Sequence, residues 1–273
     1  MDTHNFSDPT RGSASGRVTL VGAGPGDPEL LTIKAINAIK RATVLLVDDL
    51  VNPMILAHAS PRARIVQVGK RGGCVSTPQS FIEKLMILAA QDGEEVIRLK
   101  GGDPFIFGRG GEEATHLRDA GINVEIVNGI TSGLAASTVL GVPLTHRDHA
   151  HGVVFMTGHN RPGESSTNWA ALGSAVDTCR LTLVIYMGLA GISDIQAGLR
   201  QTLPAETPAA VIQHATLPQQ QAVSCTLATL EQCIRENGLR SPSIIVIGDV
   251  AAGAQAISQS QNFHPTSTTA IAA

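Results

Sequence analysis

Aromatic residues are scarce in this chain of 273 residues, which has one Trp, one Tyr and six Phe. With so few rings, an aromatic platform for stacking nucleic-acid bases is not expected. Positive charge is not in excess either: the net charge is −3, so no nucleic-acid partner is expected. The composition is 43% apolar and 16% charged, which is typical of a globular protein long enough for two modest domains.

Paired cysteines, apolar runs of membrane length and a signal-peptide core are also missing. The cysteines are Cys74, Cys179, Cys225 and Cys233. None belongs to a CxxC pair, so we expect reduced thiols in a cytoplasmic protein. No apolar run reaches the roughly 18 residues of a membrane helix, so no membrane partner is expected. Residues 1–16 and 254–273 are expected to be a disordered leader and tail.

Short runs of β-branched residues alternate with longer helical patterns along the rest of the chain. Five strand candidates separated by helical patterns lie in residues 17–128, which indicates a mostly parallel sheet with helices on its faces. Five more lie beyond residue 150, with helices expected near 132–140, 189–201 and 227–237. The predicted fold class is therefore α/β, with two α/β domains at 17–128 and 129–253. The cleft between two such domains is a usual place for a small-molecule site.

A glycine-rich turn, VGAGPGD, follows the first strand candidate and resembles the GxGxxG loop of dinucleotide-binding proteins. Gly22 and Gly24 fit the first two glycines, and Asp48 stands about 20 residues on, where such proteins have an acid. Asp27 replaces the third glycine, and Pro25 removes a backbone N–H that a phosphate would need. A dinucleotide site is therefore not expected. The turn either only connects a strand to a helix or contacts a ligand through its glycines.

The same turn contains signals for the start of a helix. Asp27 is a good N-cap residue, Pro28 suits the first helical position, and Glu29 suits the positive end of the helix dipole. We therefore expect a helix to begin at Asp27, with the protein's own carboxylates where a pyrophosphate would otherwise bind.

The segment RLKGGDPFIFGRGGEEA, residues 98–114, contains five glycines within eleven residues. Such density indicates a backbone that approaches a ligand closely or adopts positive φ. The segment follows a strand candidate, at the carboxyl end where α/β proteins bind ligands. It is not a Walker A loop, because no Gly-Lys-Ser/Thr follows. Asp103 is a candidate hydrogen-bond acceptor for a ribose, and the alternative is a simple helix-capping loop.

Cationic and histidine side chains gather in loops beside the strand candidates. They are Lys70, Arg71, Arg109, His146, Arg147, His149, His159 and Arg161. Singly, each is typical of a solvated surface, but together, on a net-acidic chain, they indicate a local site for a small polyanion. His146, His149 and His151 lie in one expected loop without a cysteine partner, so no metal site is expected.

Several of these segments occur in the same order in a known family. VGAGPGDPELLTIKA, RLKGGDPFIFGRGGEEA, GITSGLAA, PLTHRD, TGH and YMG resemble the motifs of uroporphyrinogen-III C-methyltransferases, members of the tetrapyrrole methylase superfamily. The resemblance extends over residues 17–250 and implies two α/β domains, a homodimer, and S-adenosylmethionine (SAM) held in the cleft. The chain departs from the family at Asn128, where proline is usual. Because asparagine also tolerates turn geometry, the bend is expected to remain.

The resemblance also implies a reaction. Two SAM molecules methylate carbons 2 and 7 of uroporphyrinogen III, leaving S-adenosyl-L-homocysteine and giving precorrin-2 through precorrin-1, on the way to sirohaem, cobalamin or haem d1. By the same resemblance, SAM contacts come from Pro25, Gly101, Gly102, Asp103, Ile106, Thr131, Ser132, Met187, Ala215 and Ser243. Ala215 stands where the family often has glycine, so its contact is expected through the backbone.

The substrate implied by the resemblance carries eight carboxylates, which accounts for the cations in the loops. We expect Arg109 and Arg147 to bind it, with Glu112 close to Arg109, because arginine suits bidentate carboxylate binding. In the family, residues matching Asp48 and Lys70 serve as proton acceptor and proton donor, and the alternative is that they only orient the substrate. Arg109 is too weak a base to remove a proton, so we expect it to act electrostatically.

Three other functions stay open. Another member of the superfamily would methylate a later cobalamin precursor. A dinucleotide-dependent oxidoreductase is disfavoured by Pro25 and Asp27, and a fused dehydrogenase and chelatase is not expected after a leader of only 16 residues. A binding module without catalysis is disfavoured by the cations beside two glycine-rich loops.

Overall fold

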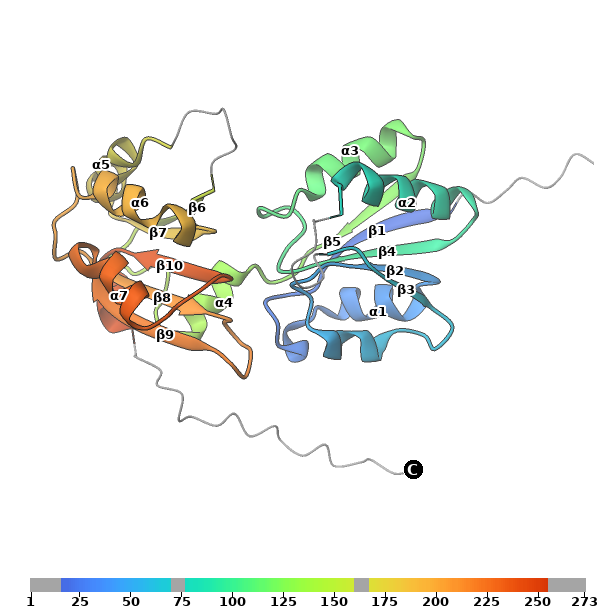
Figure 1. Cartoon of the computed structure of the whole chain (residues 1–273), viewed down its shortest axis with the longest axis horizontal. Helices are drawn as coiled ribbons and strands as arrows, with labels where there is room; N and C mark the ends of the chain where they lie inside the picture. Colours follow the sequence, from blue (N-terminus) through green and yellow to red (C-terminus); the bar gives the residue numbers. More distant parts are fainter. Residues whose placement is uncertain (1–15, 70–76, 160–166, 255–273) are drawn as a thin grey trace, which may run out of the picture. The chain divides into compact units, whose positions relative to one another are not determined.

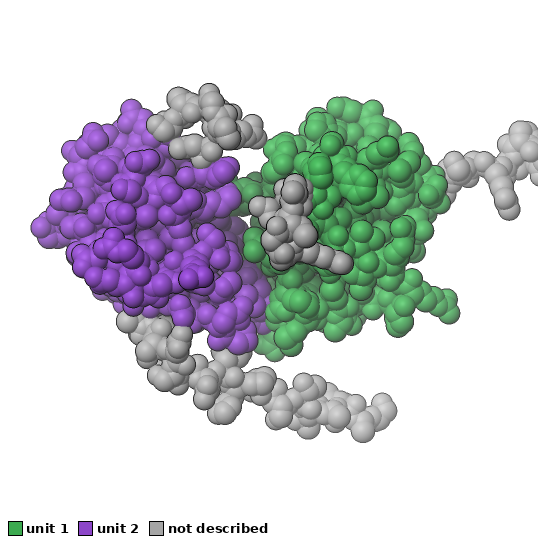
Figure 2. Space-filling model, viewed as in Figure 1, with its two compact units in different colours: residues 1–24, 28–130 green, residues 25–27, 131–273 purple. Residues whose placement is uncertain are grey.

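The computed structural model describes residues 16–69, 77–159 and 167–254. The chain divides into two compact units, which are coloured separately in Figure 2. Unit 1 comprises Met1–Gly24 and Pro28–Ile130, and unit 2 comprises Pro25–Asp27 and Thr131–Ala273. The domain limits expected from the sequence did not anticipate that Pro25–Asp27 belongs with the second unit. Of the expected leader and tail, the structure describes only Gly16 and Ala254.

Unit 1 is built on a five-stranded sheet in which every strand pair is parallel, as predicted. In the spatial order β3-β2-β4-β1-β5, its strands are β1 (Arg17–Gly22), β2 (Val44–Val47), β3 (Arg64–Gln67), β4 (Glu95–Lys100) and β5 (Asn123–Val127). Its helices are the 3₁₀ helices η1 (Pro28–Leu30) and η2 (Pro53–His58) and the α-helices α1 (Ile33–Arg41), α2 (Gln79–Gln91) and α3 (Gly110–Asp119). Figure 1 shows α1 on one face of this sheet and α2 and α3 on the other.

The side chains of β1 point alternately to the two faces of the sheet, as the period of a strand requires. Val18 and Leu20 pack in the apolar cluster with α2 and α3, whereas Val21 packs in the cluster with α1. Both faces are buried, which fits the continuous apolar run of β2. Because the strands are parallel, their carboxyl ends and the loops that follow them lie at one edge of the sheet.

Unit 2 contains a second five-stranded sheet, in which β6 and β7 are parallel and the other pairs are antiparallel. In the order β6-β7-β10-β8-β9, its strands are β6 (Gly152–Thr157), β7 (Leu181–Tyr186), β8 (Pro208–Gln213), β9 (Gln221–Thr226) and β10 (Ser243–Ile247). Its helices are α4 (Ser132–Val139), α5 (Trp169–Thr178), α6 (Ile192–Leu199), α7 (Leu230–Glu236), η3 (Leu189–Gly191), η4 (Leu227–Thr229) and η5 (Asp249–Gly253). Two α/β sheets confirm the predicted fold class.

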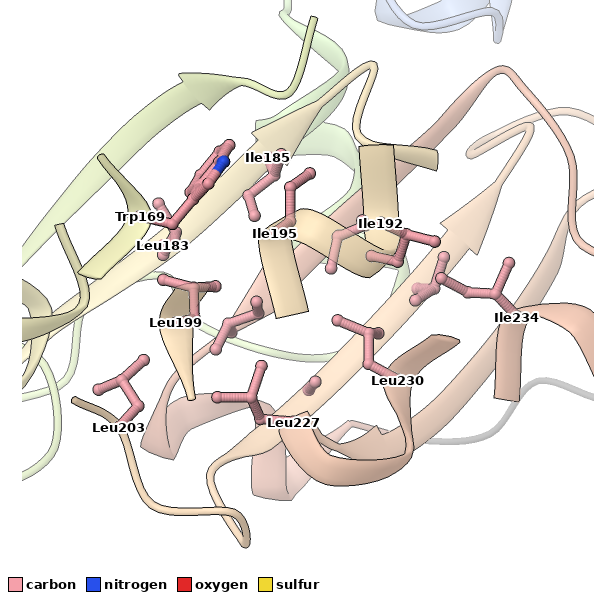
Figure 3. Close-up of a cluster of buried hydrophobic side chains, with 14 of the residues drawn as sticks. Trp169, Leu183, Ile185, Ile192, Ile195, Leu199, Leu203, Leu227, Leu230 and Ile234 are labelled. Carbon is pink, nitrogen blue, oxygen red and sulfur yellow. The ribbon is translucent and has the colours of Figure 1, made fainter. Parts of the chain in front are cut away.

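One apolar cluster joins α5, α6 and α7 to one face of the unit 2 sheet (Figure 3). Trp169 of α5 and Leu230 of α7 are buried in it together with Ile185 of β7. α4 covers the opposite face. A Cβ on Gly133 of α4 would lie 2.9 Å from Val184, which neighbours Ile185 and therefore points to the other side of the sheet.

The prediction that a helix begins at Asp27 is wrong. Pro28 and Glu29 lie in the short helix η1, and α1 begins five residues later than Pro28, capped by the Thr32 side chain. The physical reason is a long-range contact, because the Asp27 N–H donates to the Thr216 hydroxyl of unit 2 at 3.1 Å. The local capping signals were therefore outweighed by packing against a loop almost 190 residues away.

Two other helices differ from expectation. The segment NPMILAHA, whose sequence pattern predicts a short helix, forms the 3₁₀ helix η2. Helix α5 was not expected, although the side chain of Asn168 caps it by accepting a hydrogen bond from the Ala171 N–H at 3.0 Å.

Within the described ranges, no helix combines the length and the apolar character needed to cross a bilayer.

Candidate functional site

In unit 1 the two glycine-rich loops meet at the carboxyl edge of the sheet. The Gly24 N–H donates to the Gly102 oxygen at 3.1 Å, and the Gly102 N–H donates to the Gly24 oxygen at 2.7 Å. Beside them, a Cβ on Gly22 would lie 2.6 Å from the Gly102 oxygen and from the Gly129 Cα. Glycine is therefore required at Gly22 by close backbone approach. The contact brings the ends of β1, β4 and β5 together.

Asp103 fastens this junction. Its Oδ2 accepts hydrogen bonds from the Gly129 N–H and the Asn128 side-chain amide, both at 3.1 Å, and its Oδ1 accepts one from the Phe105 N–H at 2.8 Å. Asp103 is 6% exposed, so its carboxylate holds the loop, and a ribose contact stays a prediction. Asn128, which stands where the family usually has proline, stabilises the bend through its bond to Asp103.

The remaining predicted SAM residues of this loop lie beside Asp103. Gly101 directly follows β4, and a Cβ on it would lie 2.9 Å from the Leu50 Cβ. Ile106 is half-buried, and its N–H donates to the Asp103 oxygen at 3.4 Å. Residues 101–106 thus form one continuous turn at the carboxyl edge of the sheet.

Arg109 caps α3 in the left-handed conformation, with φ 57°. Its Nη2 and Nε donate to the Glu112 Oε2 at 2.5 and 3.1 Å. This hydrogen bond raises the pKa of the Arg109 guanidinium above its usual value, so the side chain stays a cation. Both side chains are well exposed. They line a pocket of about 330 Å³ whose other lining residues are Pro104, Phe105, Gly110 and Gly111.

Asp48 follows β2 at the same edge of the sheet. Its Oδ1 accepts a hydrogen bond from the Arg98 Nη2 at 2.6 Å. Its side chain is 29% exposed, so the carboxylate is held from behind by Arg98 and still reaches the surface. Lys70, the predicted proton donor, lies outside the described residues, as do the loop cations Arg71 and Arg161.

In unit 2, three predicted SAM residues lie at neighbouring strand ends. Met187 directly follows β7, Ala215 lies two residues after β8, and Ser243 begins β10. Because β10 is antiparallel to both neighbours, its first residues pair with the last residues of β7 and β8, and Ser243 pairs with Gln213. Ala215 and Ser243 are buried, whereas Met187 is 48% exposed.

Tyr186 connects α4 to this strand end. Its hydroxyl accepts a hydrogen bond from the Gly133 N–H at 2.9 Å and shares another with the Thr131 hydroxyl at 2.9 Å. Thr131 is the N-cap of α4 and Ser132 its first residue, so both predicted SAM residues lie next to the Met187 turn. Burial raises the pKa of Tyr186, so its hydroxyl stays protonated. Sequence reasoning did not select Tyr186, whose signal was its place in the YMG motif.

Pro25 reaches the same end of unit 2. The neighbouring Asp27 donates its N–H to Thr216, and a Cβ on the glycine between them would lie 2.7 Å from two carbons of Leu217. Thr216 and Leu217 directly follow Ala215. Unit 2 therefore gathers all six of its predicted SAM residues around the ends of β7, β8 and β10.

Positive φ at residues other than glycine is concentrated in these loops. Of the six such residues in the described part of the chain, five lie here, with φ between 52° and 71°: Phe107, Arg109, Met187, His214 and Thr216. Such conformations cost on the order of 1–3 kcal/mol and persist where the surroundings hold them, commonly at ligand sites. The sequence could not indicate them, because none is glycine or asparagine, the residues that usually signal positive φ.

Arg147 lies apart from the predicted SAM residues of unit 2. It is exposed, in a turn closed by the His146 N–H bonding to the Ala150 oxygen at 2.8 Å, and the turn leads into the start of β6. β6 and β7 are parallel, so this turn lies at the end of the sheet opposite Met187. The ring centroids of His146 and His149 lie 4.6 Å apart, with the ring planes tilted by 39°. Across residues 16–69, 77–159 and 167–254, no group of His, Cys, Asp or Glu side chains is arranged to hold a metal.

A larger pocket, of about 430 Å³, lies in unit 2 at the first turns of α5 and α6. Its lining includes Asn168, Trp169 and Asp194 but none of the predicted site residues. The site is therefore assigned from the strand-end loops and not from pocket size.

The opening loop lacks the features that bind a pyrophosphate in dinucleotide-binding proteins. The N–H groups of Gly24 and Gly102 each donate to the carbonyl oxygen of the other residue, and α1 begins well after the loop with Thr32 as its cap. Asp48, which stands where a ribose-binding acid would be, pairs with Arg98. The geometry thus disfavours a dinucleotide-dependent oxidoreductase and fits a ligand without phosphate.

Comparison with solved structures identifies the class of protein. A Thermus thermophilus uroporphyrin-III C-methyltransferase, solved with S-adenosyl homocysteine, is 38% identical to this chain with a TM-score of 0.72, over 87% of this chain and 99% of that one. A cobalt precorrin-4 methyltransferase is 26% identical with a TM-score of 0.75, over 89% of this chain and 99% of that one. The two-sheet fold is that of an α/β methyltransferase.

The particular family follows from the sequence comparisons. The profile of the tetrapyrrole (corrin/porphyrin) methylases matches residues 17–231. The uroporphyrinogen-III C-methyltransferase of Pseudomonas aeruginosa is 54% identical over 237 residues, which is 86% of this chain and 94% of that protein. The chain belongs to the tetrapyrrole (corrin/porphyrin) methylase family, which confirms the resemblance seen in its motifs.

Proposed function

We propose that this chain transfers methyl groups from SAM to C2 and C7 of uroporphyrinogen III and so forms precorrin-2 through precorrin-1. The observation that carries the proposal is the 54% identity to the Pseudomonas aeruginosa enzyme across 94% of that enzyme's length. The S-adenosyl homocysteine in the Thermus thermophilus structure supports SAM as the methyl donor, because it is what SAM becomes after methyl transfer.

The described residues fit a cofactor without phosphate. Pro25 offers no N–H, and Met187 is held exposed in a left-handed turn beside buried polar groups of α4 and β10. The residues proposed to hold SAM in unit 2 are Pro25, Thr131, Ser132, Met187, Ala215 and Ser243. Those proposed in unit 1 are Gly101, Gly102, Asp103 and Ile106. When bound, SAM supplies an electrophilic methyl group on a sulfonium, and the residues must align it with the pyrrole carbon.

The remaining residues are proposed to hold the macrocycle and to handle a proton. Arg109, kept cationic by Glu112, binds a substrate carboxylate, and Arg147 binds another from its exposed turn. Asp48 accepts the proton that the macrocycle loses after methylation, and Lys70 donates a proton. The partly exposed carboxylate of Asp48 suits this role. The alternative is that Asp48 and Lys70 only orient the substrate.

We further propose that the chain works as a homodimer in the cytoplasm, without nucleic-acid or membrane partners and without a metal. Ile33, Leu50 and Met54 of unit 1 are exposed by 79%, 62% and 69%, so large apolar side chains are available for a subunit contact. The described cysteines are free thiols, as expected in a reducing compartment: Cys179, Cys225 and Cys233. Cys74 lies outside the described residues. A monomeric mass in light scattering at assay concentration would contradict the dimer.

Calorimetry and a turnover assay test the proposal together. We expect the protein to bind SAM and not NAD, and to transfer two labelled methyl groups to each uroporphyrinogen III, with the chromophore of precorrin-2 appearing. NAD binding without SAM binding would overturn the proposal. SAM binding without a precorrin-2 chromophore would instead favour methylation of a later cobalamin precursor, the alternative raised by the likeness to cobalt precorrin-4 methyltransferase.

A further inference from the structure

Behind Asp48, unit 1 contains an ionic cluster that is almost entirely buried. Arg98 and Lys100 of β4 are 2% and 3% exposed, and Glu113 of α3 is 0% exposed. Only Asp48, at the edge of the cluster, reaches the surface. Buried charges are costly to desolvate, and apolar side chains of similar volume are often at least as stable. Stability alone therefore gives no reason for this cluster.

Glu113 is the centre of the cluster. Its Oε1 accepts hydrogen bonds from the Gln79 Nε2 at 2.8 Å, the Lys100 Nζ at 3.1 Å and the Arg98 Nε at 3.3 Å. Its Oε2 lies 3.1 Å from the Lys100 Nζ and, within the described ranges, receives no hydrogen bond of its own. One carboxylate is thus the counter-ion of two buried cations.

Arg98 links Glu113 to Asp48. Its Nε bonds to Glu113, its Nη1 to the Leu99 oxygen at 3.2 Å, and its Nη2 to the Asp48 Oδ1 at 2.6 Å. The planar guanidinium is therefore fixed in three directions. The Lys100 Nζ lies 3.9 Å from the other Asp48 oxygen. The orientation of Asp48 depends on Arg98, and the orientation of Arg98 depends on Glu113.

We propose that Glu113 is a positioning residue for the methylation, which acts through Arg98 and Lys100 to hold the Asp48 carboxylate in its working orientation. The inference rests on the proposed function and on the place of Asp48 in it. The two cations and two carboxylates balance, so loss of the Glu113 charge leaves one excess positive charge facing Asp48. Burial already lowers the pKa of Lys100, so Lys100 would then release its proton more readily and the cluster would rearrange.

The first test is Glu113→Gln in the full chain, which keeps the shape of the side chain and removes its charge. We expect kcat for uroporphyrinogen III to fall by about 10- to 100-fold, as for a displaced catalytic group, while KM and the Kd for SAM change by less than about threefold. The matched control is Glu83→Gln. Glu83 is also buried in unit 1, but its ion pair is with His116 at 2.8 Å and not with Arg98 or Lys100, so we expect the kcat of Glu83→Gln to stay unchanged.

A double-mutant cycle separates positioning from general loss of structure. Arg98→Lys keeps the charge and loses the fork that joins Glu113 to Asp48. If Glu113 acts through Arg98, the Glu113→Gln loss of kcat should largely disappear in the Arg98→Lys background. Full multiplication of the two losses would overturn the proposal, as would an unchanged kcat in Glu113→Gln.

A milder variant covers the case in which Glu113→Gln does not fold. Gln79→Ala removes a neutral donor from Glu113 and buries no new charge. We expect a smaller loss in kcat, again with KM and SAM binding retained, and no loss of kcat would count against the proposal. The wild-type chain distinguishes the two failures. If it does not methylate uroporphyrinogen III, the proposed function is wrong; if it does and these variants keep their kcat, only the role of Glu113 is wrong.

Discussion

Replacement of Gly22 by alanine would place a methyl group at the point where the ends of β1 and β4 meet the residues after β5. On the present backbone, that Cβ lies 2.6 Å from both the Gly102 oxygen and the Gly129 Cα, whereas Cβ atoms essentially never approach other heavy atoms within 3.0 Å. Both neighbours are backbone atoms, so no change of rotamer relieves the contact. The three loop ends must therefore move apart.

The size of the effect follows from this geometry. The Cβ would lie closer still to the Gly129 nitrogen, so the ends must separate by about 0.6 Å, which strains the two hydrogen bonds between Gly24 and Gly102. Overpacking of this kind costs about 1–3 kcal/mol, and a weakened backbone hydrogen bond adds about 1 kcal/mol. We expect Gly22→Ala to lower the free energy of unfolding by about 3 kcal/mol.

Urea unfolding followed by far-UV circular dichroism measures this loss. Trp169, the only tryptophan, is buried in unit 2, so its fluorescence reports that unit separately. Gly111→Ala is the matched control, because no atom lies within 4 Å of its Cβ and alanine favours the helix, by up to about 1 kcal/mol. The reasoning is refuted if Gly22→Ala unfolds within about 1 kcal/mol of the wild type, below the range for overpacking.

Three further predictions concern side chains of both units. Arg109→Ala should lower kcat by about 10-fold, the value of one charge-assisted hydrogen bond, and leave calorimetric SAM binding nearly unchanged; equal losses would contradict its place on the substrate side. Tyr186→Phe leaves the buried Gly133 N–H without its acceptor and should cost about 1–3 kcal/mol in chemical denaturation, whereas an unchanged midpoint would rule out this contribution. Burial and its neighbour raise the pKa of Cys225 to about 12, so iodoacetamide at pH 8 should label the exposed Cys179 first, as mapped by mass spectrometry. The raised pKa also means that the stabilising effect of the Cys225 thiol is complete below pH 9.0 and is lost as the pH rises toward 12, and equal labelling of both thiols would contradict the burial.

The strands could be predicted from the sequence because their buried residues form short apolar runs. β2 and β10 are buried along their whole length and consist almost entirely of apolar residues. The start of α1 could not be predicted, because Asp27 bonds to Thr216, far away in the sequence. A capping signal in the sequence is local, so it carries no information about a hydrogen bond to the distant Thr216 hydroxyl.

The loops of the site could also be predicted only in part from the sequence. Glycine density in residues 98–114 predicted close approach to a ligand or positive φ, and Gly102 has a φ of 67° and is in direct contact with the opening loop. The same density gave no hint that Met187 and His214 adopt positive φ, because side-chain identity says little about conformations that the surroundings impose. It also made Asp103 look like a free acceptor, although Phe105 of its own loop and Asn128 and Gly129 after β5 donate hydrogen bonds to it.

The buried ionic cluster was readable in part. Glu112 and Glu113 look alike in the sequence, as two solvated charges at the start of a helix. Successive helical residues point about 100° apart, so when Glu112 lines the surface pocket, Glu113 turns inward on the face that carries the buried Leu117 one turn later. Arg98 and Lys100 stand two residues apart in an apolar strand and therefore share one face of the sheet. Two cations on one face of a buried strand require a buried acid opposite them, and the helical period makes Glu113, rather than Glu112, the residue that can supply it.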